Sequence, residues 1–160
     1  MPLKPVVNPS EWIRNYQLRA PVDVKRMADD LGILVYELDT MPIGASGKLF
    51  QDRKSRSGWS VGVNKSDTST RKRFTIAHEL SHFLLHRNYI SNGVLDDVLY
   101  RSEHLNGAQE TEANRFAADI LMPYSLLQSA AGSALNVDDL AKTFEVSPQA
   151  MSIRLGIPLP

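Results

Sequence analysis

Two histidines four residues apart, with a glutamate between them, are the best candidates for chemistry in this sequence. They form the segment His78-Glu79-Leu80-Ser81-His82. Histidines at this spacing on a helix project from one face, where both can bind the same metal ion. Glu79 is placed to take a proton from water activated by that ion. The segment predicts a metal-dependent hydrolase with His78 and His82 as ligands and Glu79 as the catalytic base.

A catalytic zinc ion needs a third protein ligand, and the fourth position is left to water. Because the chain has no cysteine, that ligand must be a histidine or a carboxylate. The candidates are His86, His104, Glu103, Glu110 and Glu112. Three side chains in a row down a straight helix cannot converge on one ion. We therefore expect His86, one turn beyond His82, to be a buried or helix-capping residue.

Two long helices are predicted to carry these side chains. Apolar residues recur with helical spacing from Ser69 to Arg87, in a stripe that should be buried while the histidines face a cleft. A second helix is predicted for residues 108–122, with Glu110 and Glu112 at its start. Its small residues, which allow close packing against the first helix, are Ala113, Ala117 and Ala118.

The rest of the chain predicts an α+β fold. Segments 33–38, 47–51 and 59–63 are predicted to form a small, mostly antiparallel three-stranded sheet. The strand ending at Asn64 precedes the histidine helix, so an extended substrate is expected to pair with it. We expect one domain over residues 1–160, with a catalytic core at 8–134 and a helix-turn-helix-like segment at 135–160 packed on it.

Composition narrows the functional classes. The chain has 160 residues, 18 Lys and Arg against 18 Asp and Glu, and no long apolar run. We therefore expect a cytoplasmic protein without a membrane segment and without direct nucleic-acid binding. The charge of the C-terminal helices also argues against nucleic-acid binding, because contact with phosphates needs a basic face. In these helices the acidic residues outnumber the basic ones: Asp138, Asp139 and Glu145 against Lys142 and Arg154.

Two motifs together resemble the ImmA/IrrE family of zinc metallopeptidases. The first is Arg73-Phe-Thr-Ile-Ala-His-Glu-Leu-Ser-His82, and the second is Glu110-Thr-Glu-Ala-Asn-Arg-Phe-Ala-Ala-Asp-Ile-Leu-Met-Pro123. The resemblance extends to residues 22–35, 60–64 and 140–155. The chain departs from the family's histidine motif at Ser81, a position where glycine is commoner. The resemblance implies a zincin-like fold with an active-site helix pair and one Zn²⁺ per chain.

The resemblance also bears on the remaining site residues. In related metallopeptidases the first glutamate of a Glu-x-x-Ala-Asp/Asn pattern binds zinc, which selects Glu110. Asn114 shares a helix face with Glu110 and is expected to orient a ligand histidine. Glu112, about 200° away around the helix, is expected to be a solvated first-turn carboxylate. A donor to the reaction's oxyanion is expected from the irregular segment after the first helix, from Tyr89, Tyr100, Arg101 or His104.

Members of the family are associated with cleaving helix-turn-helix (XRE-type) transcriptional repressors in bacterial chromosomes, phages and mobile elements. The resemblance therefore implies a site-specific zinc endopeptidase that relieves repression, with such a repressor as its protein partner. Two alternatives remain. One is a non-catalytic, metal-binding regulatory or antitoxin-like partner protein, and the other is a DNA-binding regulator that uses its C-terminal helices. The intact Glu79 favours the peptidase, because a pure binding protein needs no base beside the metal.

Overall fold

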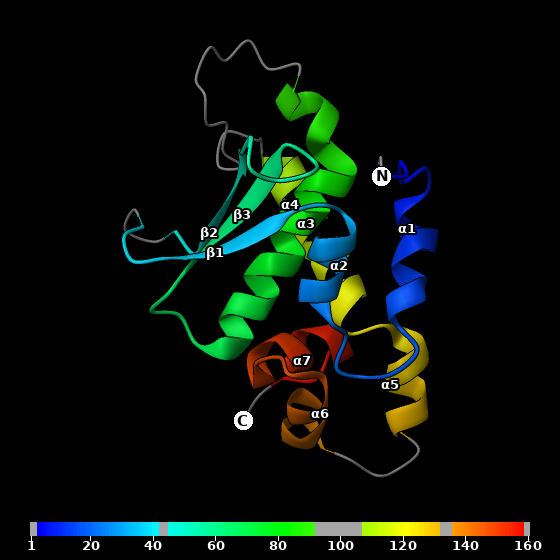
Figure 1. Ribbon diagram of the computed structural model, residues 1–160. Coiled ribbons are helices and arrows are strands. Elements are labelled where there is room, and N and C mark those ends of the chain that lie inside the picture. The colour runs from blue at the N-terminus through cyan, green and yellow to red at the C-terminus, as the bar shows by residue number, and fades with distance from the viewer. Residues whose placement is uncertain (1–2, 42–44, 92–106, 132–135, 159–160) are drawn as a thin grey trace.

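The computed structural model describes residues 3–41, 45–91, 107–131 and 136–158, without the side chains of 89–91 and 131 (Figure 1). Its elements in chain order are α1 (Pro9–Trp12), which continues as the 3₁₀ turn η1 (Ile13–Tyr16), α2 (Val24–Asp30), β1 (Leu34–Leu38), β2 (Gly47–Gln51), β3 (Trp59–Asn64), α3 (Ser69–Ser91), α4 (Gly107–Leu121), α5 (Tyr124–Ala131), α6 (Val137–Phe144) and α7 (Pro148–Leu155). The α+β class is confirmed. Within the described ranges, no helix is both long and apolar enough to cross a bilayer.

The three strands form a mixed sheet in the order β1-β3-β2. β2 pairs antiparallel with β3, and β1 pairs parallel with it on the other side. The expectation of a mostly antiparallel sheet is therefore wrong for one of the two pairings. Residues 59–63 of β3 are buried without a break, as a strand with neighbours on both sides and packed faces requires. Alternation of apolar residues reveals a strand, but it does not reveal the direction of the neighbouring strand.

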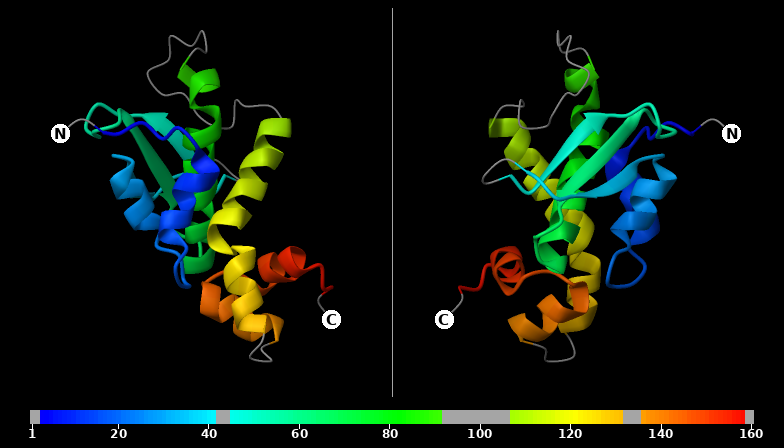
Figure 2. Two further views of the ribbon diagram at one scale, coloured as in Figure 1. Left: turned by 90° about the vertical axis from the view of Figure 1, so that its right-hand side faces the viewer. Right: turned by 60° about the vertical axis from the view of Figure 1, so that its left-hand side comes forward.

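α3 is the central element of the fold and lies between the sheet and α4 (Figure 2). Residues 75–77 and 79–83 are all buried, so the middle of α3 is covered on every side. The buried surface of α3 is therefore wider than the single apolar stripe that the sequence predicted. Hydrophobic patterning marks the face toward the sheet, whereas on the α4 side the covered residues include polar ones such as His82 and His86.

Small residues allow α4 to lie close to α3. Ala113 and Ala117 are fully buried, and the larger Phe116 and Ile120 of the same helix join the core. Close packing matters for the site because Glu110 stands one turn before Ala113, at the end of α4 where it can reach the histidines of α3.

The C-terminal helices pack on the rest of the chain through two arginines. Arg73 of α3 donates from Nε to the carbonyl oxygen of Glu145, at the turn between α6 and α7, over 3.1 Å. Arg154 of α7 forms an ion pair with Asp119 at 2.9 Å and donates to the carbonyl oxygen of Met122 at 3.0 Å. These contacts hold the helix-turn-helix-like pair against α3 and the end of α4 (Figure 2).

Replacing Gly47 by alanine is expected to lower the free energy of unfolding by about 1–3 kcal/mol. A Cβ atom at Gly47 would lie 2.2 Å from Cγ2 of Thr75 and 3.0 Å from the carbonyl oxygen of Gly62, so β2 would have to move off α3. Chemical denaturation measures the change. The matched control is Gly107→Ala, where a Cβ meets nothing within 4 Å. Equal stability of the two variants would show that β2 does not need this close approach.

Candidate metal centre and active site

Three side chains from two helices converge on one point. Nε2 of His78 and Nε2 of His82 are 3.1 Å apart. The Glu110 carboxylate reaches across from α4, with Oε2 at 3.1 Å from Nε2 of His78 and Oε1 at 2.9 Å from Nε2 of His82. The helical repeat places the two histidines one turn apart on α3, and the packing of α4 brings the carboxylate to them.

The arrangement fits a divalent metal ion. Ligand atoms about 2.1 Å from a tetrahedral centre are separated from one another by about 3.3 Å, close to the spacing of these three groups. Two imidazole nitrogens and a carboxylate are a ligand set that zinc favours. Among the described residues, His78, His82 and Glu110 form the group of histidine and acidic side chains whose ligand atoms lie within 4.8 Å of one another. The cluster could therefore hold one metal ion with a further position open toward solvent.

Burial keeps both histidines ready to act as ligands. The pKa of His82 is lowered to about 3, chiefly by burial and in smaller part by the neighbouring His78 and His86. Burial also lowers the pKa of His78, although an interaction with the Asn114 side chain works in the opposite direction. At neutral pH neither imidazole has to lose a proton before it binds a cation. The pKa of Glu110 is raised by burial, and a bound cation would favour its ionised form.

Glu79 lies beside the cluster, between α3 and β2. Its side chain is 3% exposed, and a Cβ at Gly47 of β2 would lie 3.7 Å from its Cγ. Glu79 and His78 both line one cavity of about 760 Å³. A buried carboxylate next to the ligand cluster, with access to the same cavity, is the arrangement that general-base catalysis requires.

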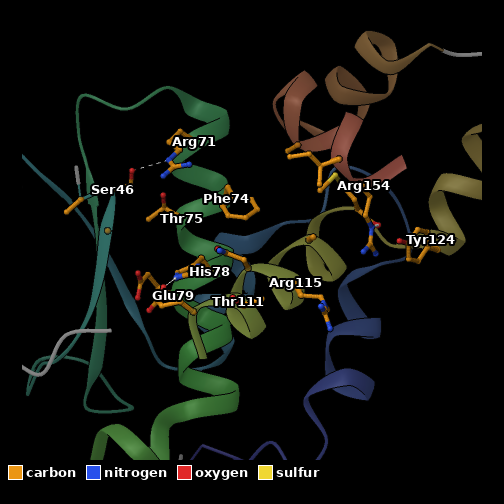
Figure 3. Close-up of a pocket in the computed structure, with 18 residues that line it drawn as sticks. Ser46, Arg71, Phe74, Thr75, His78, Glu79, Thr111, Arg115, Tyr124 and Arg154 are labelled. Carbon is orange, nitrogen blue, oxygen red and sulfur yellow. Dashed lines mark hydrogen bonds and ion pairs between the residues drawn. The ribbon is translucent and has the colours of Figure 1, made fainter. Parts of the chain in front are cut away.

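The cavity extends from the cluster to the C-terminal helices (Figure 3). Ser46 and Gly47 of the β2 side line one wall, and Thr111 and Arg115 of α4 line the other. The far end is lined by residues that sequence reasoning did not assign to the site: Tyr124, Ala150, Ile153 and Arg154. Their neighbours in the sequence give no sign of this, because only the docking of α7 where α4 meets α5 brings these residues together at the groove.

The expected substrate strand is also corrected. β3 lies in the middle of the sheet, so both of its edges are already paired. An extended peptide cannot add to it. β2 is the outer strand on the side of the cavity, and its first residue, Gly47, lines that cavity. The available edge near the site is therefore that of β2.

His86 and Glu112 lie near the ligand cluster and contact each other. The contact was not expected from the sequence. His86 is 2% exposed and does not join the three ligands, but its Nδ1 lies 2.9 Å from Nδ1 of His82. Glu112 is not a purely solvated carboxylate, because its Oε1 lies 2.6 Å from Nε2 of His86. Glu110 and Glu112 are about 200° apart around α4, yet the buried face near Ala113 lies between them, so each glutamate flanks one side of the contact with α3.

The structure places some expected site residues and leaves others outside its range. Asn114 lines the cavity one turn after Glu110 and interacts with His78. Glu103 and the oxyanion candidates Tyr100, Arg101 and His104 lie outside the described residues, as does the side chain of Tyr89.

Comparison with known proteins agrees with this geometry. The family model of the IrrE N-terminal-like domain, a peptidase family, matches residues 28–156. A solved structure, a Mycobacterium tuberculosis transcriptional regulator, superimposes with a TM-score of 0.61 at 22% identity over 92% of this chain and 45% of the regulator. The chain thus spans less than half of that protein, and the likeness shows the fold alone. No curated protein sequence gives a significant match. On the family match, which covers both the histidine helix and Glu110, the chain belongs to the IrrE N-terminal-like family of metallopeptidases.

Proposed function

We propose that this protein is a zinc-dependent endopeptidase that cleaves a helix-turn-helix transcriptional repressor at one site and so relieves repression. The observation that carries the proposal is the convergence of His78, His82 and Glu110, with the buried Glu79 carboxylate beside them at an open groove. The family match supports peptide hydrolysis. The structural neighbour is named a transcriptional regulator, and this accords with a role in transcription.

Each residue of the site has a distinct task in this proposal. His78, His82 and Glu110 would hold the metal ion, which when bound supplies Lewis-acid polarisation of water and of the scissile carbonyl. The Glu79 carboxylate accepts the proton of the attacking water and then delivers it to the nitrogen of the leaving amine. Its burial and its proximity to Gly47 keep it directed into the cavity rather than toward bulk solvent.

An extended segment of the substrate fits the groove. It would lie between the outer edge of β2 and α4, where main-chain hydrogen bonds to β2 provide binding without much sequence preference. Such contacts alone give weak binding. Selectivity would come from the far end of the groove, where Tyr124 and Ile153 are 57% and 73% exposed and Arg154 stacks over the Tyr124 ring at 3.8 Å. These apolar side chains offer a contact for a folded partner.

We expect one metal-dependent cut in the repressor encoded next to this protein and little activity on casein or short peptides. Mass spectrometry of the products after incubation with Zn²⁺, with and without a chelator, measures both. Ile153→Asp should lower kcat/KM for the repressor about tenfold while leaving zinc content unchanged. The matched control is Ile157→Asp, an exposed residue of the same segment that does not line the groove.

Two outcomes would contradict the proposal. Cutting of casein as fast as the repressor would identify a general protease, because the second surface would then contribute nothing. An equal effect of Ile153→Asp and Ile157→Asp would show that the end of the groove does not contact the partner.

A further inference from the structure

A line of hydrogen bonds leads from the ligand cluster to the surface of the protein. It starts at Nδ1 of His82, the ring nitrogen that faces away from Glu110, and crosses 2.9 Å to Nδ1 of His86. It continues from Nε2 of His86 over 2.6 Å to Oε1 of Glu112. His82 and His86 are 0% and 2% exposed, whereas the Glu112 side chain is 60% exposed. The line therefore joins two buried rings on α3 to a carboxylate on α4.

With Glu112 ionised and both imidazoles neutral, the types of atom along this line determine where its protons lie. An ionised carboxylate only accepts hydrogen bonds, so Nε2 of His86 must donate to Glu112. A neutral imidazole has one N–H, which leaves Nδ1 of His86 as an acceptor. Nδ1 of His82 must then be the donor in the bond between the two rings. It follows that Nε2 of His82 has no proton and directs its lone pair at the point where His78 and Glu110 converge.

We propose that His86 and Glu112 are positioning residues that hold His82 in the tautomer and ring orientation needed to bind the metal ion. The proposal rests on the metal binding of the proposed function and extends it to two residues beyond the ligands. A hydrogen-bond acceptor on the outer nitrogen of a ligand histidine fixes its tautomer and raises its affinity for the ion. Here the acceptor is a second histidine, which the terminal carboxylate fixes in turn.

Packing alone does not account for this arrangement. His86 is a large polar side chain in the buried part of α3, and burial of its ring is stabilising only when its nitrogens have partners. Glu112 is largely exposed, so its role in the line is not the filling of a core. The short distance to His86 is typical of a charge-assisted hydrogen bond. Both helices contribute, so the line also depends on the contact between α3 and α4.

The test compares Glu112→Ala with Glu112→Gln. Both variants lose the same charge, but glutamine keeps an oxygen that can accept the His86 proton, so the difference between them measures the hydrogen bond. We expect zinc affinity to fall about tenfold to a hundredfold in Glu112→Ala and less in Glu112→Gln. Competition with a chromophoric chelator measures affinity. Asp138→Asn, which removes an exposed first-turn carboxylate from α6, is the control and should bind as the wild type does.

A second measurement is independent of bound metal. The ¹⁵N chemical shifts of the His82 ring in the metal-free protein report its tautomer, which should be Nδ1–H in the wild type and mixed in Glu112→Ala. Unchanged tautomer and unchanged zinc affinity in both variants would overturn the positioning role. A failure of the proposed function gives a different result, because the wild type itself would then bind no zinc. If Glu112→Ala does not fold, Glu112→Gln alone still decides. The proposal expects this variant to keep the wild-type tautomer and most of the zinc affinity, so a loss of about a hundredfold with the tautomer unchanged would leave only the charge effect and reject the proposal.

Discussion

Replacing Glu79 by glutamine is expected to lower the rate of repressor cleavage by about 10²- to 10⁴-fold, the usual contribution of a general base. Glutamine has the shape of glutamate but cannot accept the proton of the attacking water. Because the Glu79 side chain is buried and closely packed beside Gly47, an isosteric replacement should leave the fold intact. Cleavage kinetics followed by mass spectrometry measure the loss. Zinc content, measured on the same samples, should equal that of the wild type, since Glu79 is not one of the three converging ligands.

The control is Glu37→Gln, which removes an exposed carboxylate of β1 that forms an ion pair with Lys72, away from the cavity. This variant should cleave at the wild-type rate. Cleavage by Glu79→Gln at that rate would show that another group accepts the proton. A wild-type chain that binds zinc and the repressor without cutting it would instead be a binding protein, and the peptidase proposal would be rejected.

The purified protein is expected to bind about one divalent metal ion per chain, with affinity reduced more than about a hundredfold by His78→Ala or Glu110→Gln. His78→Ala removes one of the three converging ligand groups, and Glu110→Gln removes the charge of another; the facing atoms of these groups lie 2.9–3.1 Å apart. His78 is the better position for alanine than His82, because His82 is fully buried and its removal would leave a cavity in α3. Elemental analysis gives the stoichiometry and chelator competition gives the affinity.

Substitutions outside the three ligands provide the comparison. Asn114→Ala should have a smaller effect on affinity than either ligand variant, since its interaction with His78 is an indirect contribution. Glu37→Gln should have none. Equal metal content in the wild type, His78→Ala and Glu110→Gln would mean that the ion binds elsewhere, and the assignment of the cluster as a metal centre would fail.

The sequence determined the local features of the fold, which depend on residues that are close along the chain. The helical repeat alone puts His78 and His82 on one face with Glu79 beside them, and the structure has these residues on one continuous helix. Strand 47–51 begins and ends where the sequence predicted it, because turn residues and the local hydrophobic period define its limits. The family motif selected Glu110, which the residue types by themselves had left among five candidates.

Tertiary structure decided what depends on how the elements pack. The pairing direction of β1, the role of β2 as the outer strand beside the cavity, and the lining of the groove by α7 all follow from contacts between distant segments. The clearest case is Glu112, which the sequence assigned to solvent because it lies about 200° around α4 from Glu110. The face that packs on α3 lies between the two glutamates, so Glu110 reaches His78 and His82 from one side while Glu112 reaches His86 from the other. Periodicity gives the angle between two side chains on one helix, but only the packing of the two helices determines what each side chain meets.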